Sequence, residues 1–324
     1  MYFDFENEKQ LKQAVFNNRM FLDIDTSTLR GELREQEPMS RHTSWKTGGN
    51  ADYFYSPADV NDLSIFISLL SDDMPITWVG LGSNLLVRDS GLPGVVISVV
   101  GVLDELELIN NNEISIGAGV LCVKAARYIA KKGLTGVEFL AGIPGSIGGA
   151  LAMNAGAYGG EIWKSIKQVE TINRDGKHKI YTKDQFQIGY RSVSLPEDEW
   201  FVACQMELEV LDKNIVEKNI KTMLRERAEA QPLGQLSCGS VFRNPPNDHA
   251  ARLIDACGLK GRKIGGASVS EKHANFIINE GNATSLDIET LIKLVKTTVY
   301  EKYSIQLTPE VRILGEAKSG ERCD

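Results

Sequence analysis

Hydrophobic and polar positions divide the first 210 residues into short runs that predict strands and a few helices. Strands are predicted over 51–55, 76–79, 95–99, 106–109, 114–118, 166–172, 179–182 and 200–210. Apolar residues at helical spacing predict helices over 57–70 and 120–132, the second of which ends at Gly133. The first helix lies between two strands, so this region contains a β-α-β unit.

The pattern changes near residues 212–218, where we place a domain boundary. Beyond it, helices are predicted over 216–231 and 250–257. A third helix should begin at Thr284, because Thr284 and Asp287 have the spacing of a capping box before an apolar stripe. The second half of the chain is therefore a separate mixture of helices and short strands.

The two ends of the chain are predicted to be simpler. Residues 7–20 have the spacing of a helix, and the first 38 residues look peripheral to the two domains. Residues 305–314 alternate like a strand, so Glu310 and Arg312 should point away from Val311.

Composition excludes several classes of function. The chain has 324 residues, enough for about two domains, with 42% hydrophobic and 24% charged residues. A net charge of −7 argues against nucleic acid as the main partner. No basic-then-apolar leader opens the chain and no apolar run approaches the ~20 residues of a membrane span, so a cytoplasmic location is expected. The five cysteines lack a C-x-x-C motif and the four histidines lack metal-ligand spacing, so reduced thiols and no metal are expected.

The stretch 142–160, GIPGSIGGALAMNAGAYGG, contains seven glycines and no charged residue. Glycine lets backbone amides approach a ligand closely, and successive amides at turns can bind an anion such as a nucleotide diphosphate. A packing turn between two elements would explain the same residues, because a glycine-rich loop alone is weak evidence.

Two further glycine turns point the same way. The predicted strand 76–79 runs into GLGSNLLV (80–87), and Gly48-Gly49 follows a threonine-rich run. Neither turn is a G-x-G-x-x-G fingerprint that opens a helix or a Walker loop, so a nucleotide would be bound differently from both of those folds. The three turns could converge on one ligand.

For each candidate catalytic residue, the sequence allows both a functional and a purely structural role. Ser240 follows Gly239 in a turn without a G-x-S-x-G elbow, so it is either a proton donor or a turn serine bonded to its own backbone. Cys238 is either a reactive thiol or an inert buried one. Arg191 and Glu310 are either surface residues or a guanidinium and a carboxyl group placed where negative charge develops on a substrate. Sequence spacing cannot bring Ser240, Arg191 and Glu310 together.

A series of motifs over about residues 38–315 favours the functional alternative. In order they are TSWKTGG (43–49), GLGSN (80–84), GIPGSIGG (142–149), YR (190–191), GSVF (239–242), KHANFI (272–277) and PEV (309–311). Each motif is modest, but seven in one order closely resemble the UDP-N-acetylenolpyruvoylglucosamine reductases, flavoenzymes of bacterial peptidoglycan precursor synthesis.

The resemblance implies an α+β fold: a two-lobed FAD-binding domain of the vanillyl-alcohol-oxidase (PCMH) type and a C-terminal α+β substrate domain. We assign 1–38 to an N-terminal extension, 39–214 to the FAD-binding domain with lobes of about 39–75 and 76–214, 215–315 to the substrate domain and 316–324 to a tail.

The resemblance also implies a reaction. NADPH would reduce bound FAD, and the reduced flavin would convert UDP-N-acetyl-3-O-(1-carboxyvinyl)-glucosamine, an enolpyruvyl ether of a UDP-sugar, to UDP-N-acetylmuramate. Arg191 and Glu310 match the family positions that polarise the substrate carboxylate, with Glu310 as a hydrogen-bonding acid. Ser240 matches the residue that delivers a proton to the α-carbon.

The residues expected to bind FAD are Thr47, Gly48, Gly80, Leu81, Gly82, Ser83, Asn84, Leu85, Ile143, Gly145, Ser146, Gly149, Asn154 and Gly156. The residues expected to bind the substrate are Tyr190, Arg243, Asn244 and Lys263, and Lys263 is equally compatible with a merely exposed position.

One feature departs from part of the family. Only nine residues separate Tyr190 from Trp200, so the chain is similar to the shorter type, which lacks an inserted tyrosine loop that folds over the substrate. Two alternatives stay open. One is another FAD-dependent oxidoreductase of the same fold, and the other is a nucleotide-sugar binding module without chemistry.

Overall fold

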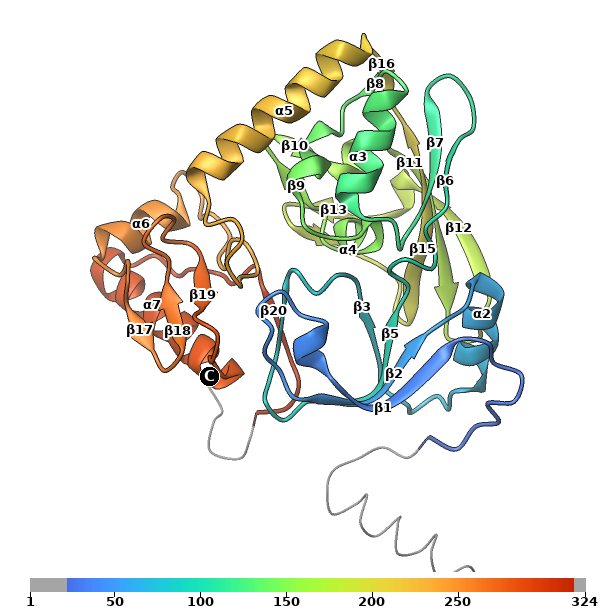
Figure 1. The fold of residues 1–324 in the computed structure, drawn as a ribbon, viewed down its shortest axis with the longest axis horizontal. Helices are drawn as coiled ribbons and strands as arrows, with labels where there is room; N and C mark the ends of the chain where they lie inside the picture. The colour runs from blue at the N-terminus through green and yellow to red at the C-terminus, as the bar shows by residue number, and fades with distance from the viewer. Residues whose placement is uncertain (1–21, 318–324) are drawn as a thin grey trace, which may run out of the picture.

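The computed structural model describes residues 22–317, so the helix predicted over 7–20 lies outside the described residues. Figure 1 shows three bodies: a blue first lobe, a largely green second lobe, and an orange-to-red C-terminal domain. One long yellow helix runs from the second lobe to the C-terminal domain, and a red strand returns to lie beside the first lobe.

The first lobe is a four-stranded sheet with one helix packed against it. Its elements are β1 (Glu32–Pro38), β2 (Asn50–Ser56), α2 (Val60–Leu69), β3 (Ile76–Val79) and β5 (Leu92–Ser98), with strand order β1-β2-β5-β3. β5 lies parallel to both β2 and β3, so the predicted β-α-β unit is confirmed. The Asp59 carboxylate accepts a hydrogen bond from the Asp62 amide, which caps the helix and starts it at Val60.

Two boundaries of this lobe differ from the sequence-based assignment. The assignment to an N-terminal extension of the residues up to 38 is wrong for 32–38, which form β1 and pair antiparallel with β2. The sheet also continues past residue 75, because β3 and β5 are hydrogen-bonded into it as far as Ser98. Both boundaries of the lobe are set by pairing between strands that lie far apart in the sequence. The local pattern of hydrophobic and polar residues does not reveal such pairing.

The second lobe is built on a five-stranded antiparallel sheet of order β12-β11-β15-β7-β6. Its strands are β6 (Leu106–Leu108), β7 (Glu113–Gly117), β11 (Ile166–Asn173), β12 (His178–Thr182) and β15 (Glu199–Glu207), with helices α3 (Cys122–Lys131) and α4 (Ile147–Ala152). The strand predicted over 200–210 divides, because β15 stays in the sheet while β16 (Glu209–Val210) pairs with β8 (Leu134–Thr135). Short hairpins complete the lobe: β9 (Gly156–Ala157) with β10 (Gly160–Glu161), and β13 (Ile188–Gly189) with β14 (Ser192–Val193).

The helix α5 (Lys213–Ala230) links the second lobe to the C-terminal domain. Asp212 caps it, so it starts three residues before the predicted position. The domain contains α6 (Ala250–Ala256), α7 (Ser285–Tyr303), β17 (Lys263–Ile264), β18 (Ala267–Val269) and β19 (Ile277–Asn279). The predicted capping box is confirmed, because Thr284 and Asp287 exchange side chain–backbone hydrogen bonds at the start of α7. Among the helices described here, none combines the length and apolar character needed to cross a membrane.

After α7, the chain returns to the segment that follows the glycine turn after β3. The strand β20 (Arg312–Leu314) pairs in parallel with β4 (Leu85–Val87). The prediction of a strand over all of 305–314 is wrong before Arg312. Pro309 forms an isolated bridge with Phe242, and the Glu310 amide donates to the Val241 carbonyl oxygen at 2.8 Å. This segment therefore pairs with the loop around Ser240, and that pairing places Glu310 between the domains.

Candidate active site

The two main glycine turns face each other across a small cavity of about 120 Å³. Ten of the residues predicted to bind FAD line it: Gly80, Leu81, Gly82, Ser83, Asn84, Leu85, Ile143, Gly145, Ser146 and Gly149. No carboxylate is among the lining residues, and glycine amides and small hydroxyl side chains make up much of the wall. These features fit the diphosphate of FAD, since amide-rich turns bind anions and a carboxylate would repel one.

Glycine is required at position 82 of this turn. Gly82 has φ +67°, in the left-handed region, and an added Cβ would lie against the carbonyl oxygen of His42. The Ser44 amide also donates to the Gly82 carbonyl oxygen at 3.1 Å, so the turn is tied to the segment after His42. A side chain at this position would force the two segments apart.

We therefore expect Gly82→Ala to destabilise the protein by about 2 kcal/mol or more, since left-handed strain alone costs about 1–2 kcal/mol. Gly234→Ala is the matched control, because Gly234 has φ +82° and no neighbouring atom within 4 Å of an added Cβ. Urea unfolding and the flavin content after gel filtration would measure the effect. Equal losses in both variants would show that the close contact with His42 contributes nothing.

Four of the predicted FAD residues lie away from this small cavity. Thr47 and Gly48 sit behind the turn, where the Thr47 carbonyl oxygen accepts from the Thr43 hydroxyl and Gly48 packs close to Val87. Asn154 is fully buried and its side-chain amide donates to the Gly189 carbonyl oxygen at 3.0 Å. Asn154 therefore supports the hairpin that carries Arg191. Gly156 lines the adjoining cavity.

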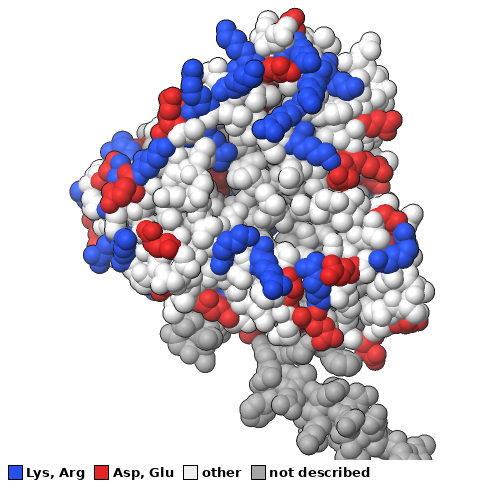
Figure 2. Space-filling view, in the orientation of Figure 1, with Lys and Arg blue, Asp and Glu red and all other residues white. Residues whose placement is uncertain are grey.

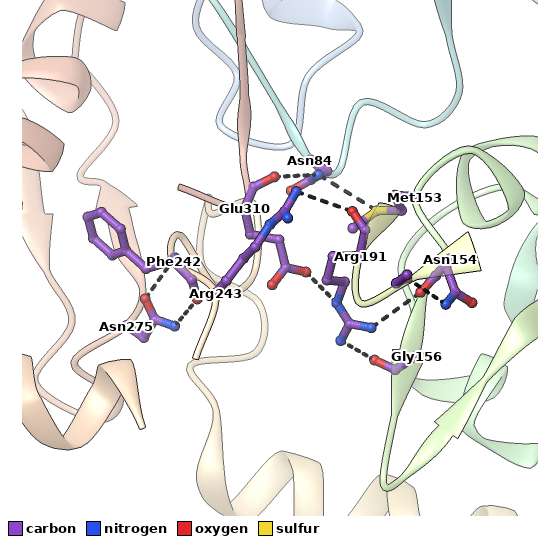
Figure 3. Close-up of polar contacts among 10 residues, drawn as sticks. Asn84, Met153, Asn154, Gly156, Arg191, Phe242, Arg243, Asn275 and Glu310 are labelled. Atoms are coloured by element: carbon purple, nitrogen blue, oxygen red, sulfur yellow. Dashed lines mark hydrogen bonds and ion pairs between the residues drawn. The ribbon is translucent and has the colours of Figure 1, made fainter. Parts of the chain in front are cut away.

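A second cavity, of about 220 Å³, adjoins the first and shares Ser83, Asn84 and Ile143 with it. Ser240, Arg191 and Glu310 all line this second cavity. Arg191 comes from the turn between β13 and β14, Ser240 from the loop after α5, and Glu310 from the segment before β20. The structure thus brings together the three predicted catalytic residues, and Figure 3 shows two of them in contact.

Arg191 and Glu310 form a largely buried ion pair. The Arg191 Nε donates to Glu310 Oε1 at 2.9 Å, and the two side chains are only 15% and 14% exposed. The other guanidinium nitrogens donate to the carbonyl oxygens of Asn154 and Gly156 (Figure 3). Arg191 has φ +54°, which is uncommon for a residue with a side chain and clusters at functional sites.

Hydrogen bonds to its backbone hold Glu310 in place, and the pKa of its carboxyl group is raised. Its carbonyl oxygen accepts from the Asn84 side-chain amide at 3.1 Å, so a residue of the predicted FAD turn also positions Glu310. Burial raises the pKa of the Glu310 carboxyl above its ordinary value, although Arg191 and Arg243 act in the opposite direction. Burial dominates, so Glu310 holds a proton more tightly than an exposed glutamate.

Hydrogen bonds hold the backbone of the loop around Ser240, while the Ser240 hydroxyl group makes no hydrogen bond among the described residues. The Val241 amide donates to the Asn275 carbonyl oxygen at 2.9 Å, and the Asn275 side chain bonds both the amide and the carbonyl of Phe242 (Figure 3). Within residues 22–317, no hydrogen bond occupies the Ser240 hydroxyl. The turn-serine alternative is therefore not observed, and the hydroxyl is available to a ligand.

The surroundings of Cys238 fit an inert, buried thiol. Its thiol is buried and lies 3.4 Å from the Leu85 carbonyl oxygen. Burial raises the pKa of the Cys238 thiol to about 12, so it stays protonated and unreactive. No group of three or more His, Cys, Asp or Glu side chains in residues 22–317 is arranged to hold a metal ion.

The predicted substrate residues divide into two groups. Tyr190 and Asn244 line the second cavity, and the Arg243 Nη2 donates to the Arg191 carbonyl oxygen at 3.2 Å, so Arg243 braces the hairpin that carries Arg191. Lys263 does not join them. It lines another cavity of about 420 Å³, and its Nζ lies 3.7 Å from a Glu280 carboxylate oxygen.

Two residues were missed by sequence reasoning. Asn275 lies in the KHANFI motif, which marked it as a residue of interest. Its residue type alone did not indicate that it would hold the Phe242 backbone. Arg227 lies on α5 in no recognised motif, and it lines both the second cavity and a larger one of about 700 Å³. Lys and Arg side chains gather on both sides of the hollowed middle of this face (Figure 2).

Comparisons with known proteins agree with this geometry. Residues 231–314 match the family described as the C-terminal domain of UDP-N-acetylenolpyruvoylglucosamine reductase, and residues 51–181 match a family described as an FAD binding domain. Relatives named UDP-N-acetylenolpyruvoylglucosamine reductase include one from Alkalilimnicola ehrlichii, 52% identical over 89% of this chain and 97% of its own length. Another, from Legionella pneumophila (strain Lens), is 50% identical over 91% and 97%.

A solved structure is also similar over most of the chain. It is the UDP-N-acetylenolpyruvylglucosamine reductase from Thermus caldophilus, with a TM-score of 0.77 and 32% identity. The similarity covers 89% of this chain and all of that one.

Proposed function

The chain belongs to the UDP-N-acetylenolpyruvoylglucosamine reductase family, and from that membership we propose that Ser240, Arg191 and Glu310 perform the family's reaction. The protein is an FAD-dependent oxidoreductase of peptidoglycan synthesis that uses NADPH to reduce the enolpyruvyl ether of UDP-N-acetylglucosamine to UDP-N-acetylmuramate. The observation that supports the residue roles best is the convergence of these three side chains on one cavity beside the glycine turns.

The reduction adds a hydride to the methylene carbon of the enolpyruvyl group and a proton to its α-carbon. When bound, FAD supplies the hydride that it has accepted from NADPH. The turns at Gly80–Leu85 and Ile143–Ser146 would hold the FAD diphosphate through backbone amides. Asn84 would then serve twice, since its side chain also fixes Glu310.

Arg191 and Glu310 would stabilise the charge that builds on the substrate carboxylate. The Arg191 guanidinium suits a carboxylate ligand, because it offers planar, paired N–H donors. Glu310, whose pKa is raised by burial, can present a proton as a hydrogen-bond donor to the same carboxylate. The electron-rich α-carbon is then basic enough to take a proton from the Ser240 hydroxyl.

We further propose where each part of the chain acts. Tyr190 and Asn244 lie at the substrate side of the cavity, and Arg243 acts through the Arg191 hairpin. The predicted boundary at 214/215 falls inside α5, whose buried Val216 and Ile220 pack in the core of the second lobe, so the substrate domain would begin after α5, near residue 231. A cytoplasmic location fits the nucleotide substrates, and the net charge of −7 gives no support to a nucleic-acid partner.

Anaerobic mixing of the two half-reactions tests this function. The purified protein should carry flavin, NADPH should bleach its visible absorbance, and the enolpyruvyl UDP-sugar should restore it with formation of UDP-N-acetylmuramate. A colourless protein that binds UDP-sugars would be a binding module. Bleaching without re-oxidation by this substrate would indicate an FAD-dependent oxidoreductase with a different acceptor.

A further inference from the structure

The segment that follows Ser240 is held from two sides. On one side, the Glu310 amide donates to the Val241 carbonyl oxygen at 2.8 Å. On the other side, the Val241 amide donates to the Asn275 carbonyl oxygen at 2.9 Å. The backbone that leads away from Ser240 therefore lies between the segment before β20 and the segment before β19, and both of these segments contribute to its position.

The Asn275 side chain continues this pairing at the next residue. Its Oδ1 accepts from the Phe242 amide at 3.0 Å, and its Nδ2 donates to the Phe242 carbonyl oxygen at 2.8 Å (Figure 3). Within residues 22–317, these are the hydrogen bonds that the Phe242 backbone makes. Phe242 is 2% exposed and Asn275 is 3% exposed, so loss of the side chain would leave a buried amide and a buried carbonyl group unpaired.

A carboxamide is well suited to this position. It offers one acceptor oxygen and one donor nitrogen, as a peptide group does, so it can bond both backbone groups of a single residue. An aspartate of the same size only accepts when it is ionised, and it would turn an oxygen toward the Phe242 carbonyl oxygen. The identity of the residue at position 275 therefore matters, and not only its volume.

Among the groups used in the proposed function, Ser240 depends most on Asn275. Glu310 has further support, because the Asn84 side chain bonds its carbonyl oxygen at 3.1 Å and Arg191 bonds its carboxyl group at 2.9 Å. The Ser240 hydroxyl makes no hydrogen bond among the described residues, so its position follows from the backbone of its loop.

We propose that Asn275 is a positioning residue for the proton transfer, which holds the backbone after Ser240 so that the Ser240 hydroxyl meets the α-carbon of the bound substrate. The inference rests on the proposed function, in which Ser240 delivers that proton. Asn275 lines the same cavity, but both polar groups of its side chain already bond Phe242. A displacement of about 1 Å can lower the rate of a reaction by about 10²-fold, so a residue that acts through the backbone can control this step.

The test compares holoenzymes of the wild type, Asn275→Asp, Asn275→Ala, Ser240→Ala and the double variant Ser240→Ala/Asn275→Asp. Stopped-flow measurement gives the limiting rate and the half-saturating substrate concentration of flavin re-oxidation by the enolpyruvyl UDP-sugar. It also gives the rate of flavin bleaching by NADPH. Flavin content and Tm are recorded for each protein.

Asn279→Asp is the matched control. Asn279 is also buried, at 5% exposed, and its Nδ2 donates to the Trp45 carbonyl oxygen at 2.7 Å. Its Oδ1 accepts from two backbone amides, and Asn279 does not line the cavity that contains Ser240. The control therefore loses the same kind of buried donor bond at a position away from the Ser240 loop.

We expect Asn275→Asp to lower the limiting rate of re-oxidation by about ten-fold or more, with the half-saturating substrate concentration and the bleaching rate near wild type. Asn275→Ala should lower this rate at least as much. The double variant should be no more than about two-fold slower than Ser240→Ala, because Asn275 acts through Ser240 and the two losses are then not additive. Asn279→Asp should lower Tm to a similar extent and keep the wild-type rate of re-oxidation.

Several results would overturn the inference. Additive losses in the double variant would show that Asn275 does not act through Ser240. Equal slowing of bleaching and re-oxidation, equal slowing by Asn279→Asp, or loss of flavin from both Asn275 variants would reduce its role to maintaining the fold. A wild-type rate in Asn275→Asp would exclude a positioning role. If Ser240→Ala itself left re-oxidation unchanged, the proposed role of Ser240 would be wrong, and this outcome is distinct from the others.

Discussion

Replacing Ser240 by alanine should slow re-oxidation of the reduced flavin by the enolpyruvyl substrate by about 10²-fold or more, which is the usual contribution of a positioned general acid. The bleaching of flavin by NADPH should stay near its wild-type rate, because that step needs no proton from Ser240. The Ser240 hydroxyl lines the cavity of about 220 Å³ and makes no hydrogen bond within residues 22–317, so its removal leaves no buried partner unsatisfied.

Stopped-flow measurement of the two half-reactions checks this expectation. Ser237→Ala is the matched control, because Ser237 lies in the same loop but lines the larger cavity instead of the catalytic one. Its two rates should both resemble the wild type. If Ser240→Ala slowed both half-reactions equally, the proton-donor role would be wrong. The substitution would then act by disturbing the structure of the whole loop.

Replacing Glu310 by glutamine should lower the rate of substrate-driven re-oxidation by about 10²-fold, the usual contribution of a positioned acid whose proton can move toward a developing negative charge. The glutamine keeps the size of the side chain but removes the ionisable proton and the ion pair with Arg191 at 2.9 Å. Glu271→Gln is the control, because Glu271 is exposed on the C-terminal domain and lies outside the catalytic cavity. A glutamine variant with an unchanged rate would exclude Glu310 from the chemistry.

The raised pKa of Glu310 also predicts a pH dependence of stability. The folded state binds this proton more tightly than the unfolded state, whose pKa is near the ordinary value of 4.5. The contribution of Glu310 to the free energy of unfolding is therefore fully present below pH 4.5 and is lost as pH rises through the folded pKa. Urea unfolding at a series of pH values should show this loss in the wild type and not in Glu310→Gln. Parallel pH profiles for the two proteins would contradict the assignment.

The local features that the amino-acid sequence predicts well depend on short-range chemistry. The helix after Thr284 was predictable because Thr284 and Asp287 are three residues apart and cap each other. The glycine turn at 80–84 was recognisable because positive φ and close backbone approach exclude most other residues, as at Gly82. Each of these signals is complete within a few consecutive residues.

Predictions failed where a long-range contact decides the outcome. The segment 305–311 alternates like a strand, yet it leaves the sheet because Pro309 and Glu310 pair with the loop around Ser240. The sequence left Lys263 equally compatible with a substrate-binding and an exposed position, and the structure places its Nζ 3.7 Å from a Glu280 carboxylate oxygen. Conversely, no residue near Arg227 in the sequence indicates that it lines two cavities.

By itself, then, the order of residues determined the motifs, the mixed α and β content and the family that those motifs identify. Only the tertiary structure decided which groups meet. Arg191 and Glu310 are 119 positions apart and come into contact because β20 is hydrogen-bonded to β4 while Asn84 and Val241 hold the Glu310 backbone. The physical reason is that helix and turn preferences act over a few residues, whereas the position of a side chain in a cavity depends on packing between segments that the chain brings together only when it folds.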